Sequence, residues 1–420
     1  MLPMRMRPMR MRPMRKYSSL VGGAALLVAL VACAGAPESF AQQSQQKPQQ
    51  SQPQQKPRAR DLGVPFEGTP GGFNAITDVK GVEVGHVTLI SGEGRLVAGR
   101  GPVRTGVTAV FPQGRGFRGR VFAAWHTLNG NGELTGAAWL EESGALGTPI
   151  LITNTHSVGV VRDAVIEWNA RKSAGGSYSG DLSLPVVTET YDGFLNDING
   201  FHVRKEHAFA ALDGAKAGPV AEGNVGGGTG MVAHGFKGGI GTSSRVLTAR
   251  EGGHTVGALV QANYGRRDLL RIAGVPVGRE ITDLMPAPGK AGDGEGSIIV
   301  VVATDAPLMP HQLKRLARRV SLALGVLGGR GENSSGDIFI AFSTAGAAEV
   351  SKEAGLAELK MLPNDLINPL FRATVEATEE AIVNALVAAE TMTGIGGNKV
   401  HALPHDRLRE VLRKYNRLTK

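Results

Sequence analysis

Residues 297–303 read Ser297-Ile298-Ile299-Val300-Val301-Val302-Ala303, and this run decides the fold class. β-Branched side chains fit a pleated strand well, so the run is predicted to be a strand. Because it is apolar on both faces, the strand is expected to be covered on both sides, as in layered α/β proteins. Residues 290–296, which precede it, are polar and rich in Gly and are predicted to form a loop.

The rest of the body has a mixed α/β pattern. Short runs rich in β-branched residues predict strands at 107–111, 149–153, 184–188, 257–262, 298–303 and 338–342. Helical periodicity predicts helices at 161–171, 310–327 and 368–391. Pro310 suits the first turn of the second helix, and Asn368 suits the N-cap of the third.

The composition narrows the class of protein. The 420-residue chain is 42% apolar but only 5% aromatic, and 59 of its residues are Gly. An aliphatic core with many tight turns or close backbone approaches is therefore expected. A single cysteine, Cys33, excludes a disulfide framework and a Cys-rich zinc site.

The net charge of +9 comes from the first sixty residues. These hold ten Lys and Arg and one acid, Glu38; removing them from the totals of 46 and 37 leaves 36 of each sign in residues 61–420. A body with balanced charge argues against a nucleic-acid partner.

Residues 1–33 are predicted to be an export signal, because a basic start is followed by a short apolar run. Three fates of this segment stay open. Leu30-Val31-Ala32-Cys33 resembles a bacterial lipobox, which would lipidate Cys33 and anchor the protein to a membrane. Ser39-Phe40-Ala41 fits ordinary signal cleavage, and a retained membrane span is the third alternative. The predicted location is the bacterial cell envelope, with export to the periplasm.

Residues 34–60 are rich in Gln and Pro and are predicted to be a disordered linker. The Gly-rich run at 223–230 resembles a phosphate-binding loop but lacks the Gly-Lys-Ser/Thr ending. No His-Glu-x-x-His spacing and no Gly-x-Ser-x-Gly elbow occur. A nucleotide site, a metal site and an α/β-hydrolase site are therefore all disfavoured.

Ser297 stands out on chemical grounds. If the Gly296–Ser297 bond were cut, Ser297 would carry a free α-amine beside its hydroxyl, at the end of a rigid strand. Such an amine has a pKa of roughly 7.7–8, so it can act as the base for its own hydroxyl. The plain alternative is a loop followed by a strand that happens to begin with Ser.

The sequence around Ser297 resembles the DmpA/BapA family, which comprises L-aminopeptidase D-amidase/D-esterases and β-peptidyl aminopeptidases. Similar blocks occur in the family's order at 154–159, 188–193, 223–231, 238–245, 260–265, 296–308 and 335–338. The resemblance looks nearest to the L-aminopeptidase D-amidase branch, which also has Gly before the nucleophile.

This resemblance implies an αββα sandwich like that of N-terminal-nucleophile hydrolases, with a different chain connectivity. It implies self-cleavage between Gly296 and Ser297, giving a large chain (61–296) and a small chain (297–420). It implies a short peptide or amino-acid amide as substrate, no metal or organic cofactor, and a homo-oligomer of processed units.

The resemblance also implies roles for particular residues. Ser297 corresponds to the nucleophile, and Ser335 and Asp337 to the pair that supports it. The acid is Asp here, where β-peptidyl enzymes have Glu. Asn263 corresponds to the donor to the oxyanion, and Glu189 and Tyr191 to the pocket for the substrate's ammonium group.

Two alternatives remain at this point. An acyltransferase of the ornithine acetyltransferase kind would also cut itself, but it uses a Thr nucleophile in a motif absent here. A solute-binding lipoprotein with this fold would remain uncut and bind without turnover. The joint presence of Ser297, Asn263, Ser335 and Asp337 favours the aminopeptidase.

Overall fold

The computed structural model describes residues 56–116, 119–172, 184–286, 296–345 and 359–419. The predicted export signal, most of the predicted linker and loop residues 290–295 lie outside these ranges. Residues 56–60, expected to belong to the linker, instead pack on the body, and Ala59 is fully buried. The body therefore begins a few residues before the expected boundary at residue 61.

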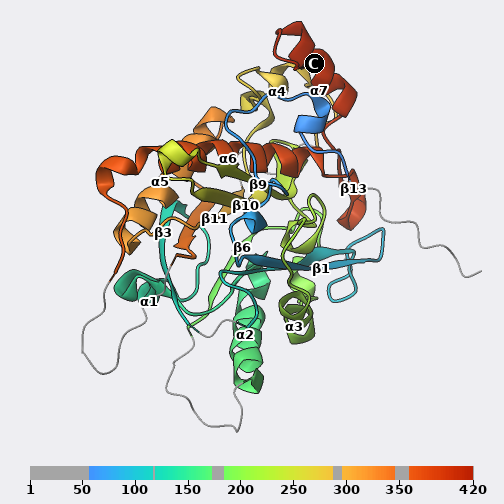
Figure 1. Cartoon of the computed structure of the whole chain (residues 1–420). Helices are drawn as coiled ribbons and strands as arrows, with labels where there is room; N and C mark the ends of the chain where they lie inside the picture. The colour runs from blue at the N-terminus through green and yellow to red at the C-terminus, as the bar shows by residue number, and fades with distance from the viewer. Residues whose placement is uncertain (1–55, 117–118, 173–183, 287–295, 346–358, 420) are drawn as a thin grey trace, which may run out of the picture. The chain divides into compact units, whose positions relative to one another are not determined.

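Two sheets form the centre of the molecule (Figure 1). One has four strands in the order β1 (Glu83–Ser91), β2 (Val103–Phe111), β5 (Ile150–Asn154), β6 (Val186–Thr190). The other has six in the order β4 (Ala145–Leu146), β3 (Val121–Gly130), β12 (Gly336–Ser343), β11 (Ser297–Thr304), β10 (Thr255–Asn263), β9 (Gly239–Val246). Two hairpins are added by β7 (Val232–Ala233) with β8 (Phe236–Lys237) and β13 (Met392–Thr393) with β14 (Lys399–Val400).

Helices cover the outer faces of both sheets (Figure 1). α5 (Pro310–Val326) and α6 (Asn368–Val387) lie on the six-stranded sheet, whereas α2 (Val158–Lys172) and α3 (Lys205–Asp213) lie on the four-stranded sheet. Shorter helices are α1 (Ala137–Ser143), α4 (Val277–Glu280) and α7 (His405–Lys414). No helix in the described ranges is long and apolar enough to cross a membrane.

Strand β11 shows how the layers arise from the sequence. Ile298, Val300 and Val302 belong to the core beneath α5 and α6. Ile299, Val301 and Ala303 belong to the core between the two sheets. Since side chains alternate along a strand, an unbroken apolar run supplies both layers. The prediction of a doubly covered strand and of an αββα sandwich is confirmed.

Some predicted boundaries need correction. The third predicted helix ends at Val387 rather than Thr391, and its N-cap is Ile367, with Asn368 already in the helix. Pro310 does occupy the first turn of α5, and Gly328 with φ +97° follows its end. Strands β1, β3 and β9 had not been predicted.

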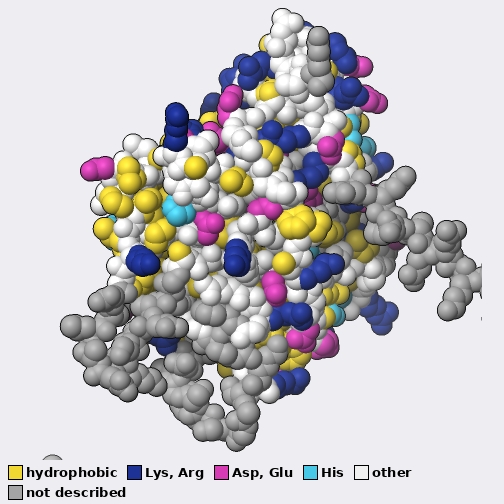
Figure 2. Space-filling model, viewed as in Figure 1, with side chains coloured by type: hydrophobic (Ala, Val, Ile, Leu, Met, Phe, Trp, Pro, Cys, Tyr) yellow, Lys and Arg dark blue, Asp and Glu magenta, His cyan; other side chains and the backbone are white. Residues whose placement is uncertain are grey.

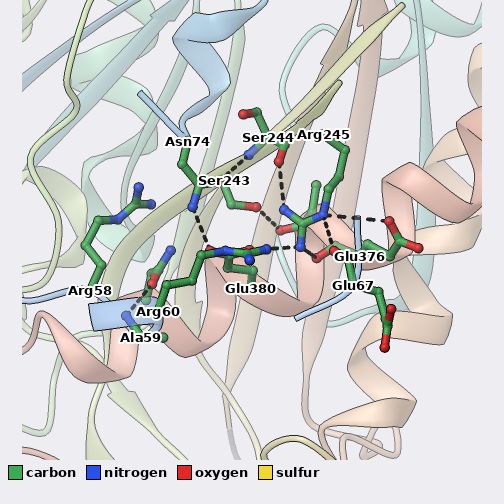
Figure 3. Close-up of polar contacts among 12 residues, drawn as sticks. Arg58, Ala59, Arg60, Glu67, Asn74, Ser243, Ser244, Arg245, Glu376 and Glu380 are labelled. Atoms are coloured by element: carbon green, nitrogen blue, oxygen red, sulfur yellow. Dashed lines mark hydrogen bonds and ion pairs between the residues drawn. The ribbon is translucent and has the colours of Figure 1, made fainter. Parts of the chain in front are cut away.

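A largely buried ion-pair network attaches the segment of residues 56–60 to α6 and β9 (Figure 3). Arg60 donates through Nε and Nη2 to the two carboxylate oxygens of Glu380, each at 2.8 Å, and Nη2 of Arg245 lies 2.8 Å from the same group. Burial alone would raise the pKa of Glu380, but hydrogen bonding and charge from Arg60 and Arg245 lower it overall. Glu380 and Arg245 are almost completely buried, and their ion pair offsets part of the free energy that both charges lose when they leave water.

Charges are interspersed on the viewed surface. Figure 2 shows Lys and Arg side chains scattered among Asp and Glu over this face. This distribution agrees with the equal numbers of basic and acidic residues in the body.

Candidate active site

Ser297 is the first residue of β11 and is only 5% exposed. It lies between two neighbouring strands, opposite Asn263 of β10 and Gly336 of β12. By the alternation along β11, its side chain is on the face directed at the other sheet, with Ile299 and Val301. The hydroxyl is therefore held by a rigid central strand rather than by a loop.

One backbone N–H contacts both groups that a self-cleavage would involve. The N–H of Gly336 is 3.2 Å from Oγ of Ser297 and 3.3 Å from the carbonyl oxygen of Gly296. A donor on a carbonyl oxygen favours negative charge there, as in an oxyanion hole. The same donor holds the serine hydroxyl beside the carbonyl group that precedes it.

Gly296 is packed so closely that no side chain fits. A Cβ built on it would lie 2.2 Å from the carbonyl oxygen of Asn263 and 2.9 Å from Cα of Tyr264. Both neighbours are backbone atoms of a paired strand end, so they cannot move aside cheaply. The lack of a Cβ thus lets the chain before Ser297 approach β10.

Ser335 and Asp337 flank Gly336 in the sequence and form a hydrogen-bonded pair. The hydroxyl of Ser335 donates to Oδ1 of Asp337 at 2.6 Å, so the shorter carboxylate of Asp does reach Ser335. The N–H of Asp337 donates to Oδ1 of Asn129 at 2.8 Å. Burial raises the pKa of Asp337, and hydrogen bonds from Ser335, the Ile298 backbone and Asn129 oppose the rise.

Asn263 ends β10 beside Ser297 and is fixed at both ends of its amide. Its Nδ2 donates to the carbonyl oxygen of Tyr191 at 2.9 Å, and its Oδ1 accepts from the N–H of Val232 at 2.8 Å. A carboxamide nitrogen carries two hydrogens, so one donor remains beyond the bond to Tyr191. A fixed donor of this kind is suited to a developing oxyanion.

Glu189 lies at the end of β6 and is 3% exposed. The backbone N–H of Glu133 donates to Oε1 at 3.1 Å, and the Thr155 hydroxyl donates to Oε2. Burial raises the pKa of Glu189, and these two hydrogen bonds oppose the rise. A buried carboxylate with fixed oxygens is suited to bind an ammonium group.

Two further observations connect Glu189 with Ser297. A Cβ built on Gly132 would lie 3.4 Å from Oε1 of Glu189 and 3.2 Å from Cα of Gly336, so both border the same small space. Nε2 of Gln261 on β10 donates to the Thr190 hydroxyl at 2.8 Å, which ties the end of β6 to the six-stranded sheet.

Tyr191 differs from the other predicted site residues because it is 51% exposed as a residue. Its hydroxyl lies close to Gly193, where a Cβ would be 2.3 Å away. Its backbone carbonyl, rather than its ring, makes the contact with Asn263. Tyr191 is thus placed at the border of the site.

Sequence reasoning missed several groups of this site. Asn129 and Gly132 lie in stretches where no motif had been recognised, and the N–H groups of Glu133 and Gly336 are backbone donors without a side-chain signal. Thr155 lies within the block 154–159 and could have been singled out from it.

Packing accounts for the Gly-rich run at 223–230. A Cβ on Gly227 would lie 2.1 Å from Oε1 of Gln261, and one on Gly228 would lie 2.5 Å from the backbone nitrogen of Ile240. All three glycines of the 226–228 turn are buried. Within the described ranges, no group of three or more His, Cys, Asp or Glu is arranged to hold a metal ion.

An αββα sandwich with a buried Ser at the start of a central strand defines the class of N-terminal-nucleophile-type hydrolases. Residues 74–400 match the model of peptidase family S58, and the chain belongs to this family. It is therefore a serine aminopeptidase with the Ntn hydrolase fold of that family.

Relatives with known names support this assignment. A β-peptidyl aminopeptidase, BapA of Sphingosinicella microcystinivorans, is 56% identical over 86% of this chain and 93% of the relative. Among solved structures, a β-aminopeptidase of a Burkholderia species is 53% identical, has a TM-score of 0.77, and is matched over 85% of this chain and 98% of its own. The L-aminopeptidase D-Ala-esterase/amidase of Ochrobactrum anthropi is 50% identical, with a TM-score of 0.80, over 87% of this chain and 100% of its own.

These identities do not support the expectation that the L-aminopeptidase D-amidase branch is the nearer one. In sequence, the Ochrobactrum enzyme, at 50% identity, is no more similar to this chain than the Burkholderia β-aminopeptidase, at 53%. Gly296 is required by close packing at one position, so its presence does not indicate which branch of the family the rest of the chain resembles.

Proposed function

We propose that the chain cuts itself between Gly296 and Ser297 and then uses Ser297 as the nucleophile of an aminopeptidase. The observation that carries this proposal is the N–H of Gly336, shared between Oγ of Ser297 and the carbonyl oxygen of Gly296. In self-cleavage, Oγ attacks the Gly296 carbonyl carbon, the C–N bond breaks, and the proton from Oγ passes to the released nitrogen. Water then hydrolyses the ester, which leaves Gly296 with a carboxylate and Ser297 with a free α-amine.

Catalysis then follows from the new amine. The α-amine of Ser297 takes the proton of its own hydroxyl, and Oγ attacks the carbonyl of the substrate's first residue. The second hydrogen of the Asn263 amide stabilises the oxyanion, and Glu189 binds the substrate's ammonium group. The leaving amine takes the proton, and water hydrolyses the acyl ester. The Ser335–Asp337 pair brackets Gly336 and holds the strand end that contacts Ser297.

The proposed substrates are short peptides and amino-acid amides or esters with a free N-terminus. The Sphingosinicella and Burkholderia relatives are named as β-peptidyl and β-aminopeptidases, which supports β-amino-acid amides as substrates of this chain too. Brief incubation with a slow ester substrate and acid quenching should trap the acyl group. Mass spectrometry should then show the added mass on the small chain, at its N-terminal Ser297. An added mass on any other peptide would contradict the proposal.

Replacement of Glu189 by Gln is expected to raise KM for amino-acid amides about 30- to 150-fold, with a smaller change in kcat. The reason is that a buried charge pair that loses one partner costs about 2–3 kcal/mol or more. Steady-state kinetics with an amino-acid amide measures this, and the N-acetylated amide serves as the matched control substrate. An unchanged preference for the free amine in Glu189→Gln would rule out this role.

The ion-pair network also bears on the processed enzyme. Arg60 and Arg245 precede the proposed cleavage site in the sequence, whereas Glu380 follows it, so the network would join the two products of cleavage. We expect Glu380→Ala to lower the free energy of unfolding by about 3 kcal/mol, because the buried Arg245 loses its nearer carboxylate and keeps only Glu376, at 3.7 Å.

Chemical unfolding in the Ser297→Ala background measures this change, because unfolding of one uncut chain is not coupled to the separation of two chains; coincident transitions by two probes establish that the unfolding is two-state. Glu410→Ala, an exposed Glu→Ala change in α7, serves as the control and should stay within about 0.5 kcal/mol. If both substitutions lowered the free energy of unfolding equally, the ion-pair network would not stabilise the protein more than an exposed Glu does.

Export to the cell envelope and assembly into a homo-oligomer are part of the proposal and rest on the sequence pattern and on the family resemblance. The N-terminus of the mature protein decides between the routes of export. A diacylated Cys33 would establish the lipid anchor, an N-terminus at Gln42 would establish ordinary cleavage, and native mass would give the number of subunits.

A further inference from the structure

A buried carboxylate that the mechanism above does not use lies immediately after Tyr191. Asp192 is completely buried, and its partners are neutral donors. Nδ2 of Asn154 donates to Oδ2 at 3.0 Å, Nδ2 of Asn196 donates to Oδ1 at 3.0 Å, and Thr105 adds a third hydrogen bond. No basic side chain of the described ranges forms an ion pair with it.

Burial without a charged partner shifts the pKa of Asp192. Burial raises the pKa of Asp192 to about 6, although three side-chain hydrogen bonds and one from its own backbone oppose the rise. The surroundings of Asp192 thus favour its neutral form more than water does. Groups that lower stability in this way are concentrated at functional sites.

Asp192 anchors the turn that follows β6. The N–H groups of Leu195 and Asn196 donate to its backbone carbonyl at 3.1 and 3.0 Å, while its side chain binds Asn154 at the end of β5. Oδ1 of Asn196 in turn accepts from the N–H of Arg104 on β2 at 2.9 Å. The turn is therefore fixed to two strands of the four-stranded sheet.

The position of the Tyr191 carbonyl follows from this anchoring. This carbonyl belongs to the peptide group that joins Tyr191 to Asp192, and its oxygen accepts the Asn263 amide at 2.9 Å. The planar peptide bond transmits any displacement of Asp192 to this oxygen. Asn263 lies opposite Ser297 in the sheet, so its orientation bears directly on the reacting groups.

We propose that Asp192 is a positioning residue: it fixes the Tyr191 carbonyl and thereby aims the Asn263 amide at the oxyanion formed beside Ser297. This inference rests on the role proposed for Asn263. It assigns to Asp192 an effect on the transition state and not on the binding of the substrate's ammonium group.

A double-mutant cycle tests the inference. Asp192→Asn is expected to lower kcat about tenfold and to leave KM within twofold, because a transition-state interaction is weakened. In the Asn263→Ala background the same substitution should lower kcat less than twofold, because Asp192 acts through Asn263. All rates are measured on an activated amino-acid ester and expressed per mole of processed small chain.

Asp197→Asn is the matched control. Asp197 lies in the same turn and is also buried, but it accepts from the N–H groups of Gly99 and Gly101 and is not joined to the carbonyl that binds Asn263. Its substitution should leave kcat within twofold. If Asp192→Asn does not accumulate as folded protein, Asn154→Ala removes one of the donors and enters the same cycle, with the same expected coupling.

The outcomes separate the two claims. A tenfold loss from Asp192→Asn in both backgrounds, or a raised KM with unchanged kcat, would overturn the positioning role alone. If Asn263→Ala itself retained the wild-type kcat, the role of Asn263 would be overturned, and the inference with it.

Discussion

Ser297→Ala is expected to leave the chain uncut and to reduce aminopeptidase activity on the order of 10⁶-fold, the loss found when a serine hydrolase loses its nucleophile. Both effects have one cause: the hydroxyl that opens the Gly296–Ser297 bond is also the one that attacks the substrate. The change removes a single oxygen from a side chain that is 5% exposed, so the fold should be retained. Gel electrophoresis reports cleavage, and hydrolysis of an amino-acid amide reports activity.

The control for this substitution is Ser343→Ala. Ser343 ends the neighbouring strand β12, is also buried, and donates to the carbonyl oxygen of Ala306 at 2.6 Å. Its loss should lower stability by about 1 kcal/mol and leave cleavage and turnover intact. Cleavage in Ser297→Ala would contradict the account, since another group would then have opened the chain.

The second large effect is expected at Asn263. Asn263→Ala should lower kcat about 10²- to 10³-fold, equivalent to about 2.7–4 kcal/mol, because the oxyanion loses a preorganised donor. KM should change little, because the interaction is made in the transition state. Steady-state kinetics of the processed enzyme measures both constants.

Asn263→Asp refines this test. The carboxylate keeps an acceptor for the N–H of Val232, but it replaces the donor to Tyr191 by an oxygen. We expect a loss at least as large as that of Asn263→Ala. If Asn263→Asp retained the wild-type kcat, the amide donor would have no part in catalysis.

The sequence predicted the parts of the fold that depend on apolar patterning. β11 was recognised because its aliphatic run supplies two cores, and α5 because Pro310 and the Gly pair after Leu327 mark its ends. β9 was missed for the opposite reason: it reads Gly-Ile-Gly-Thr-Ser-Ser-Arg-Val. Its buried polar groups are satisfied by distant partners, as when Ser243 donates to the carbonyl oxygen of Ala377 at 2.6 Å. Such a strand is fixed by tertiary contacts and carries no local pattern.

The side chains of the candidate site could be named from the sequence, whereas its backbone groups could not. Ser297 was singled out on chemical grounds, and the family resemblance added the roles of Asn263, Glu189, Ser335 and Asp337. Pairing of β10, β11 and β12 brings Ser297 beside Asn263 and beside the Ser335–Asp337 segment, whereas Glu189 comes from β6 of the other sheet. The shared N–H of Gly336 and the close approach of Gly296 to Asn263 are properties of the folded backbone, so a sequence pattern cannot reveal them.

One serine is proposed to serve both self-cleavage and catalysis. Intact mass measurement with N-terminal sequencing of the purified wild type, beside Ser297→Ala, tests this double role. We expect two chains in the wild type, the smaller having 124 residues and beginning at Ser297, and one inactive chain in the variant. An active wild type that remains a single chain would contradict it.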